Sequence, residues 1–269
     1  RDPDISLHAI GDVVAADPVM RVQVVSACNQ HFGERALGTL SNAHHCVAML
    51  GLDRITALLQ GFTPCKGNLT DPKDYFYFQA IVNSLHSAEQ VAAWSKFRNQ
   101  SNKDDMFVST LLSGVPDWCL WRFAHADMRI IHHLITVDNV PALEAEQAVL
   151  GCRREEIAQQ LAQRWHFPES IQNALSGAQL PNASFLLRCA RRAMADPHYR
   201  IPKREPENKL VNAPALAISL GNLLASETPR GWYSHPTQRI ISVIAAYLDH
   251  PMEEVKQLSH QVAVNASQL

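Results

Sequence analysis

Apolar residues recur along most of the chain at intervals of three and four, the spacing that places them on one face of an α-helix. Between about residues 75 and 98, for example, Phe78, Ile81, Val82 and Leu85 repeat in this way. No stretch alternates apolar and polar residues over the length of a strand, and no glycine-rich phosphate loop occurs. The pattern therefore predicts an all-α protein.

Capping residues mark where several of the predicted helices begin and end. Ser6 precedes an apolar stripe and Asp17 precedes Pro18, and both arrangements are typical of a helix N-terminus. Gly51 predicts a helix end, because glycine readily adopts the left-handed conformation found there. After a first helix that follows Ser6, the predicted helices cover about residues 18–29, 39–51, 53–61, 75–98, 104–112, 126–136, 142–150, 154–165, 168–176, 182–195, 213–226, 236–248 and 251–266.

Loop-forming residues divide this run of helices. Proline, glycine, asparagine and aspartate gather between residues 63 and 73, a composition typical of a connecting loop. We expect a boundary there, which separates an N-terminal helical subdomain, residues 1–62, from a second helical subdomain, residues 74–180. Residues 181–269 are predicted to form an additional C-terminal helical region.

Composition restricts the classes of protein that fit the chain. Of its 269 residues, 46% are hydrophobic and 19% are charged, which is ordinary for a globular protein. The formal net charge of -2 provides no basis for non-specific nucleic-acid binding, and no apolar run has the length of a membrane span. The six cysteines show no CxxC pairing, as expected for reduced thiols. We expect a soluble, cytoplasmic protein that binds neither nucleic acid nor membranes.

Thirteen histidines raise the question of metal chemistry. The densest group of candidate ligands is His125, Asp127, His132 and His133, with Asp138 close by. A metal site needs ligands that converge from several elements, and adjacent histidines on a helix point about 100° apart. No local motif surrounds a serine or cysteine nucleophile either. We therefore expect no metal, no cofactor and no catalytic residue.

Two segments carry a more specific pattern. In the first, Asp17-Pro18 opens a helix, Asn29 follows an apolar stretch, and Leu50-Gly51 closes the segment. The second keeps a fixed spacing of Glu146, Val149, Leu150, Gly151, Arg154, Ile157, Leu161, Trp165, Pro168 and Ile171. Over about residues 5–180 the chain resembles the HDOD family, the HD-related output domains of bacteria. The resemblance implies a bundle of two helical subdomains and a role in bacterial signal transduction.

The chain departs from the ligand set that this resemblance implies for catalysis. HD phosphohydrolases hold one or two metal ions through a His, a His-Asp pair and a further Asp, and the metal activates water. His86 stands where the first His would fall, but Ser113-Gly114 occupies the place of the His-Asp pair. Arg154 stands where many family members keep a His, and Ala178-Gln179 replaces a terminal His-His. Catalysis by the family route is therefore not expected.

The leading hypothesis is a non-catalytic regulatory module of bacterial signal transduction. It would bind a signalling protein partner, or a small ligand in the remnant of the HD pocket at His86, Ser113 and Arg154. In that pocket the guanidinium of Arg154 would suit an anion.

Two other hypotheses stay open at this point. The first is a metal-dependent phosphohydrolase with a rearranged ligand set made of His86, His125, Asp127 and His132. The second is a nucleic-acid-associated regulator, which the near-neutral net charge disfavours.

Overall fold

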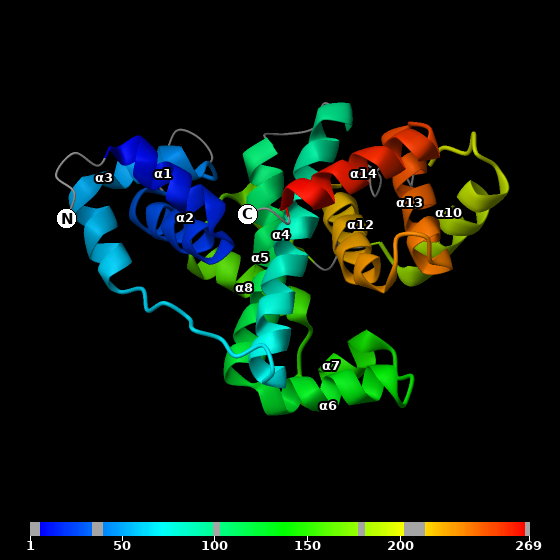
Figure 1. The fold of residues 1–269 in the computed structure, drawn as a ribbon, viewed down its shortest axis with the longest axis horizontal. Coiled ribbons are helices and arrows are strands. Elements are labelled where there is room, and N and C mark those ends of the chain that lie inside the picture. The colour runs from blue at the N-terminus through cyan, green and yellow to red at the C-terminus, as the bar shows by residue number, and fades with distance from the viewer. Residues whose placement is uncertain (1–5, 34–39, 99–102, 177–180, 202–212, 267–269) are drawn as a thin grey trace. The chain divides into compact units, whose positions relative to one another are not determined.

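The computed structural model describes residues 6–33, 40–98, 103–176, 181–201 and 213–266. Within these ranges every regular element is a helix, so the predicted all-α class is confirmed (Figure 1). No helix in the described ranges combines the length and the apolar character needed to cross a lipid bilayer. Residues 99–102, which separate the helices predicted over about residues 75–98 and 104–112, lie outside the described residues.

The chain forms two compact units that do not follow its order. Unit 1 contains residues 1–82 and 112–172, and unit 2 contains residues 83–111 and 173–269. Each unit therefore draws on two separate stretches of sequence. The division predicted above, into residues 1–62, 74–180 and 181–269, stays a prediction.

Unit 1 begins with three helices that pack on one another: α1 (Leu7–Ala16), α2 (Pro18–Phe32) and α3 (Ala43–Gln60). The predicted caps are present, because Ser6 Oγ accepts a hydrogen bond from the Ala9 amide and Asp17 Oδ1 accepts from the Val19 amide. Gly51 has a φ of 72° and a ψ of 167°, which interrupts the helical conformation inside α3. Two helices were predicted to meet there, and the positive φ accounts for the glycine.

The rest of unit 1 contains the first part of α4 (Pro72–Arg98), the last part of α5 (Lys103–Phe123), α6 (His125–Thr136), α7 (Ala142–Leu150), α8 (Arg154–Arg164) and most of α9 (Glu169–Ala174). Trp121 and Phe76 stack with ring centroids 4.4 Å apart at the centre of an apolar cluster that includes Met128 and Ile131. This cluster joins α4 and α5 to α6.

Helix α5 is longer than predicted. A helix over about residues 104–112 was expected, but α5 continues without a break through Pro116 to Phe123. A proline inside a helix removes one backbone hydrogen bond. Val115, Trp118 and Trp121 are buried on the continued helix, and this apolar burial offsets the lost bond.

Unit 2 contains the second part of α4, the first part of α5, α10 (Ala183–Ala195), α12 (Pro214–Glu227), a 3-10 turn (Thr228–Arg230), α13 (His235–Leu248) and α14 (Met252–Ala266). Its core includes Trp94, which is almost fully buried, together with Leu216 and Ile244. Gly221 allows α12 to approach α4 closely, since a Cβ at this position would lie 2.6 Å from Val91 Cγ2.

Candidate functional site

The residues predicted to form the remnant HD pocket are distributed over both units. His86 lies on α4 in unit 2, whereas Ser113 on α5 and Arg154 at the start of α8 belong to unit 1. Ala178-Gln179 lies outside the described residues. The surroundings of the three predicted residues are therefore considered within each unit.

Ser113 and Gly114 occupy the middle of α5, where both are half-buried. Neither residue offers the imidazole or carboxylate that would hold a metal ion at this place. Asp117 lies one helical turn after Ser113 and so on the same face of α5. Asp117 is therefore the carboxylate of α5 that lies beside Ser113.

Arg154 is held by two carboxylates. Its Nε donates a hydrogen bond to Glu146 Oε1 over 2.7 Å, and its backbone amide donates to Glu146 Oε2 over 3.2 Å. Its two terminal nitrogens form ion pairs with Glu146 and Asp117. Glu146 has only 2% of its side chain exposed, so this ion triad joins α5, α7 and α8 at a largely buried place.

The triad determines the pKa of the Arg154 guanidinium and the net charge around it. Burial by itself lowers the pKa of this guanidinium, but the charges of Asp117 and Glu146 and their hydrogen bonds more than offset it and raise the pKa above its usual range. Arg154 is therefore always charged, and two carboxylates outweigh its one positive charge. Such a surrounding disfavours a bound anion, and the anion contact stays a prediction.

His86 takes part in a polar network inside unit 2. Gln90 Nε2 lies 3.0 Å from His86 Nε2 and donates a hydrogen bond to the backbone carbonyl of Ser259 over 2.7 Å. Gln90 and Ser259 are both fully buried. The ring of Trp232 lies 6.2 Å from that of His86 and 3.9 Å from that of His260. The network therefore connects α4 with α14 and with the segment before α13.

Burial sets the protonation of His86, and the hydrogen bond with Gln90 bears on which ring nitrogen carries the proton. Because the carbonyl of Ser259 requires a donor, Gln90 presents Nε2 to it, and His86 Nε2 must then accept a hydrogen bond from the same group. Burial lowers the pKa of His86 to about 4. His86 is thus a neutral imidazole at pH 7, with its proton on Nδ1.

The rearranged ligand set of the phosphohydrolase hypothesis is not assembled on α6. His125, Asp127 and His132 are all exposed. Among the described residues, they do not form a group of three whose ligand atoms lie close together. The His132 ring instead lies 5.3 Å from the ring of Phe76. Sequence spacing indicated these three residues as candidate ligands. In the structure they are surface side chains of one helix.

Unit 2 also contains a pocket of about 390 Å³ between α10 and α13. Its walls combine apolar surface from Met194 and Ala246 with the polar groups of Tyr199, Tyr233 and Gln238. Pockets of this size, largely apolar with a few polar groups, are typical of sites for small molecules. Sequence analysis did not predict this pocket, because its walls come from segments far apart in the chain.

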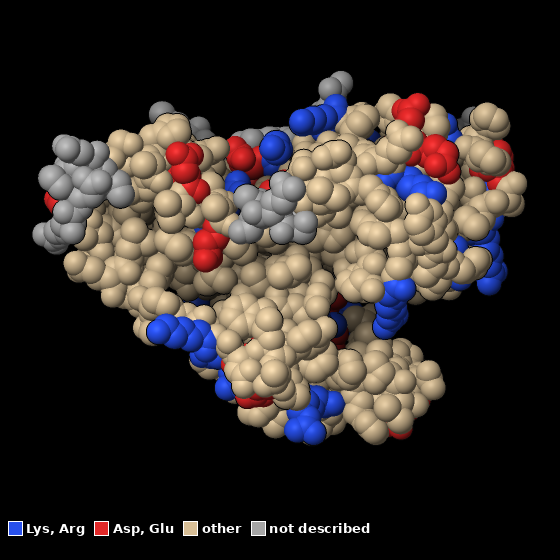
Figure 2. Space-filling model, viewed as in Figure 1, with Lys and Arg blue, Asp and Glu red and all other residues tan. Residues whose placement is uncertain are grey.

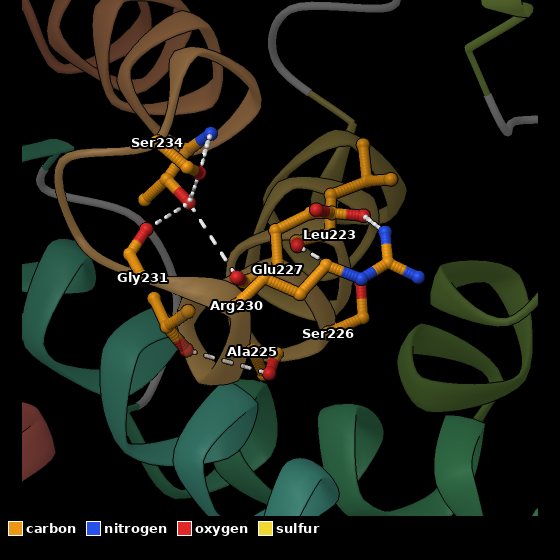
Figure 3. A network of polar contacts seen from close by, with 9 residues as sticks. Leu223, Ala225, Ser226, Glu227, Arg230, Gly231 and Ser234 are labelled. Atoms are coloured by element: carbon orange, nitrogen blue, oxygen red, sulfur yellow. Dashed lines mark hydrogen bonds and ion pairs between the residues drawn. The ribbon is translucent and has the colours of Figure 1, made fainter.

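The turn from α12 to α13, which leads into this pocket, is held by a polar network (Figure 3). Thr237 Oγ1 donates a hydrogen bond to the Gly231 carbonyl over 2.9 Å and lies 2.9 Å from Ser234 Oγ. Arg230 forms an ion pair of 2.8 Å with Glu227 across the same turn. Thr237 is fully buried, so its hydroxyl has no access to water.

Replacing Thr237 with valine keeps the shape of the side chain and removes this donor. The Gly231 carbonyl then loses its partner, and we expect the free energy of unfolding to fall by about 1–3 kcal/mol. Urea denaturation followed by circular dichroism measures the change. The exposed Ser226→Ala variant, which removes a bond to the Leu223 carbonyl, is the control and is expected to cost less than about 0.5 kcal/mol. An equal cost for both variants would contradict the interpretation.

The structure brings one further group together that sequence analysis did not connect. His8 and Asp12 on α1 meet His44 on α3 at the surface of unit 1. The spacing of four between His8 and Asp12 was visible in the sequence. The contact with His44, 32 residues away from Asp12, depends on the packing of α1 on α3.

Three solved structures are similar to this chain. A protein from Shewanella amazonensis SB2B, provisionally assigned as a phosphohydrolase, has a similar structure with a TM-score of 0.50 and 14% identity, over 99% of this chain and 88% of that one. An HDOD domain protein of unknown function from Geobacter sulfurreducens gives a TM-score of 0.46 at 16% identity, over 99% and 86% of the two chains. A provisionally assigned signal transduction protein from Marinobacter aquaeolei VT8 gives 0.47 at 20%, over 99% and 54%.

No curated protein matches the sequence. The HDOD domain model matches residues 1–181, which is more than half of the chain and includes both segments that carry the resemblance. On this match, the chain belongs to the HDOD family.

Proposed function

We propose that this protein is a non-catalytic regulatory module of bacterial signal transduction, which acts by binding a protein partner or a small ligand. One observation carries the proposal. Two carboxylates, Glu146 and Asp117, hold Arg154 in an ion triad, and by the resemblance Arg154 stands where many family members keep a His. A guanidinium repels a metal cation, and the two carboxylates nearest to it are already engaged.

Two further observations support binding as the mode of action. Ser113-Gly114 lies within an unbroken helix and supplies no metal ligand where the His-Asp pair would be. The pocket of unit 2 has a volume suited to a small, partly apolar molecule with polar groups for Tyr199 and Gln238. A small-molecule signal would therefore bind in unit 2.

The formal net charge of -2 does not favour nucleic acid as the partner. On the face drawn in Figure 2, Lys and Arg side chains are scattered among Asp and Glu side chains and uncharged residues. Binding to a phosphate backbone requires a concentrated basic surface. A protein partner or a small ligand remains the proposal.

A phosphodiesterase assay tests the loss of catalysis. With bis(p-nitrophenyl) phosphate and added Mg²⁺, Mn²⁺, Ni²⁺ or Zn²⁺, we expect the same rate of hydrolysis as with the metal salt alone. The reason is that, within the part of the chain that the structure describes, no three metal-ligating side chains meet at Ser113 or Arg154 to activate water. The His132→Ala variant serves as the matched control, since it removes a ligand of the rearranged set. Turnover by the wild type that this variant abolishes would overturn the proposal and establish the phosphohydrolase hypothesis.

A further inference from the structure

Three metal-ligating side chains face one point on the surface of unit 1. His8 Nδ1 lies 3.2 Å from Asp12 Oδ2, and His44 Nε2 lies 2.9 Å from Asp12 Oδ1. The two imidazole rings have their centroids 5.2 Å apart. One ligand atom from each residue lies within 4.8 Å of the other two. Among the described residues, no other three His, Cys, Asp or Glu side chains meet in this way.

The two helices hold these groups in fixed positions. His8 and Asp12 are four residues apart and so lie on one face of α1, whose start is fixed by the Ser6 cap. His44 lies in the first turn of α3, whose N-cap is Asn42. The ligands therefore converge from two packed elements, as a metal site requires and as the histidines of a single helix cannot achieve.

Gly11 allows His44 to reach this point. A Cβ at residue 11 would lie 2.5 Å from His44 Cδ2, closer than real atoms approach, so any other residue would displace the imidazole. Glycine in the interior of a helix is unfavourable relative to alanine. The close contact of the His44 ring with the backbone of α1 accounts for glycine at this position.

The donor set fits a particular class of ion. Two imidazole nitrogens and one carboxylate oxygen are ligands of Zn²⁺ and its neighbouring divalent transition metals, with a fourth tetrahedral position left for water. With metal–ligand bonds of about 2.0–2.1 Å, neighbouring donors in a tetrahedral site lie about 3.3 Å apart. The separations of 3.2 Å and 2.9 Å join the two histidines to different oxygens of Asp12, and one ligand atom from each residue lies within 4.8 Å of the other two, so a small adjustment of the exposed side chains brings the three donors to this spacing. Mg²⁺ and Ca²⁺ prefer oxygen donors and fit the set poorly.

We propose that His8, Asp12 and His44 form a binding site for Zn²⁺ or a similar divalent transition ion. The bound ion joins α1 to α3. The site is separate from the HD position, because its ligands come from elements other than α5 and α8. The metal-site proposal therefore does not depend on the proposed regulatory function. A negative result for one proposal leaves the other unaffected.

Isothermal titration calorimetry of the whole, metal-free chain with Zn²⁺ tests this site. The wild type is expected to bind one ion here, and His44→Ala and Asp12→Asn are expected to weaken that binding at least about 100-fold, more than the loss of an outer-shell partner. His45→Ala is the matched control, since neighbouring side chains on a helix point about 100° apart. Its affinity should equal that of the wild type. Mg²⁺ should give no comparable binding.

The Gly11→Ala variant provides a sharper test, because it keeps all three ligands. The added methyl group displaces the His44 ring, and the affinity for Zn²⁺ should fall at least about tenfold. Alanine favours the helix, so a fall cannot be attributed to a loss of helical structure. Substitution of Co²⁺ for Zn²⁺ should give the visible absorption of a four-coordinate site in the wild type and not in His44→Ala.

The other histidines and the six cysteines could bind Zn²⁺ elsewhere, so the variants decide the outcome. Equal affinity and stoichiometry in the wild type, His44→Ala and Asp12→Asn would show that the proposal is wrong, as would a wild type that binds no Zn²⁺. Circular dichroism verifies that each variant folds. Should Asp12→Asn fail to fold, His8→Ala replaces it, since the His8 side chain is 79% exposed and its loss disturbs no packing.

Discussion

Replacing Arg154 with methionine is expected to lower the free energy of unfolding by about 3–5 kcal/mol. Methionine has a similar length but no charge, so the carboxylate of Glu146 would stay buried without its cation. An unpaired buried charge is among the most costly defects a fold can contain. Urea denaturation followed by circular dichroism measures the loss. Amide hydrogen exchange in α7 and α8 should locate it to the surroundings of the triad.

Two further variants distinguish the loss of the triad from the general effect of removing an arginine side chain. Arg153→Met removes the exposed neighbouring charge and should cost less than about 0.5 kcal/mol. Combining Glu146→Gln with Arg154→Met removes both charges of the Arg154–Glu146 pair. The double variant should therefore recover much of the stability that Arg154→Met alone loses. A cost below about 1 kcal/mol for Arg154→Met alone would mean that the triad is a solvated surface pair, and would remove the main support for the proposed function.

Acidification from pH 7 to pH 4 is expected to destabilise unit 2 through His86 by about 3 kcal/mol. As the pH falls below the ordinary histidine value of about 6.5, the unfolded chain binds a proton at this residue. The folded protein does not, because burial lowers the pKa of His86 to about 4. The unfolded state therefore gains stability throughout this interval, and the contribution of neutral His86 is lost as the pH approaches 4.

The variant His86→Gln isolates this contribution from the other groups that titrate in the same range. Glutamine stays neutral and keeps an oxygen that can accept from Gln90 Nε2. Urea denaturation at several pH values should show a shallower loss of stability in acid than for the wild type. His133→Gln, at an exposed position, should follow the wild-type profile. Parallel profiles for the wild type and His86→Gln would contradict a depressed pKa at this histidine.

Local signals in the sequence predicted the helices well. Ser6 and Asp17 each accept a hydrogen bond at the helix start that their side chains indicated. The extent of α5 was the main error, since a glycine and a proline at 114 and 116 usually end a helix. Burial of Trp118 and Trp121 stabilises the continued helix beyond this glycine and proline. Burial is a property of the folded chain and is not visible in the local sequence.

The candidate sites were less accessible to sequence reasoning. Arg154 was identified by its place in the HDOD pattern, but its partner Asp117 is 37 residues earlier and lies on another helix. The resemblance could indicate which residue had replaced a histidine, and could not indicate what neutralises it. In the same way, the pairing of Asp12 with His44 follows from helix packing and from the absence of a side chain at Gly11.

The two longest helices of the described chain belong to both units. Helix α4 passes from unit 1 into unit 2 after Val82, and α5 returns after Leu111. Trp94 and Met106, on these helices, form one core with residues of α12 and α13 that lie beyond residue 181. The part matched by the family model therefore contains only some of the residues that form this core. A truncation near residue 181 would remove the residues of α12 and α13 from the core that contains Trp94 and Met106, so the shortened chain should be markedly less stable than the whole chain.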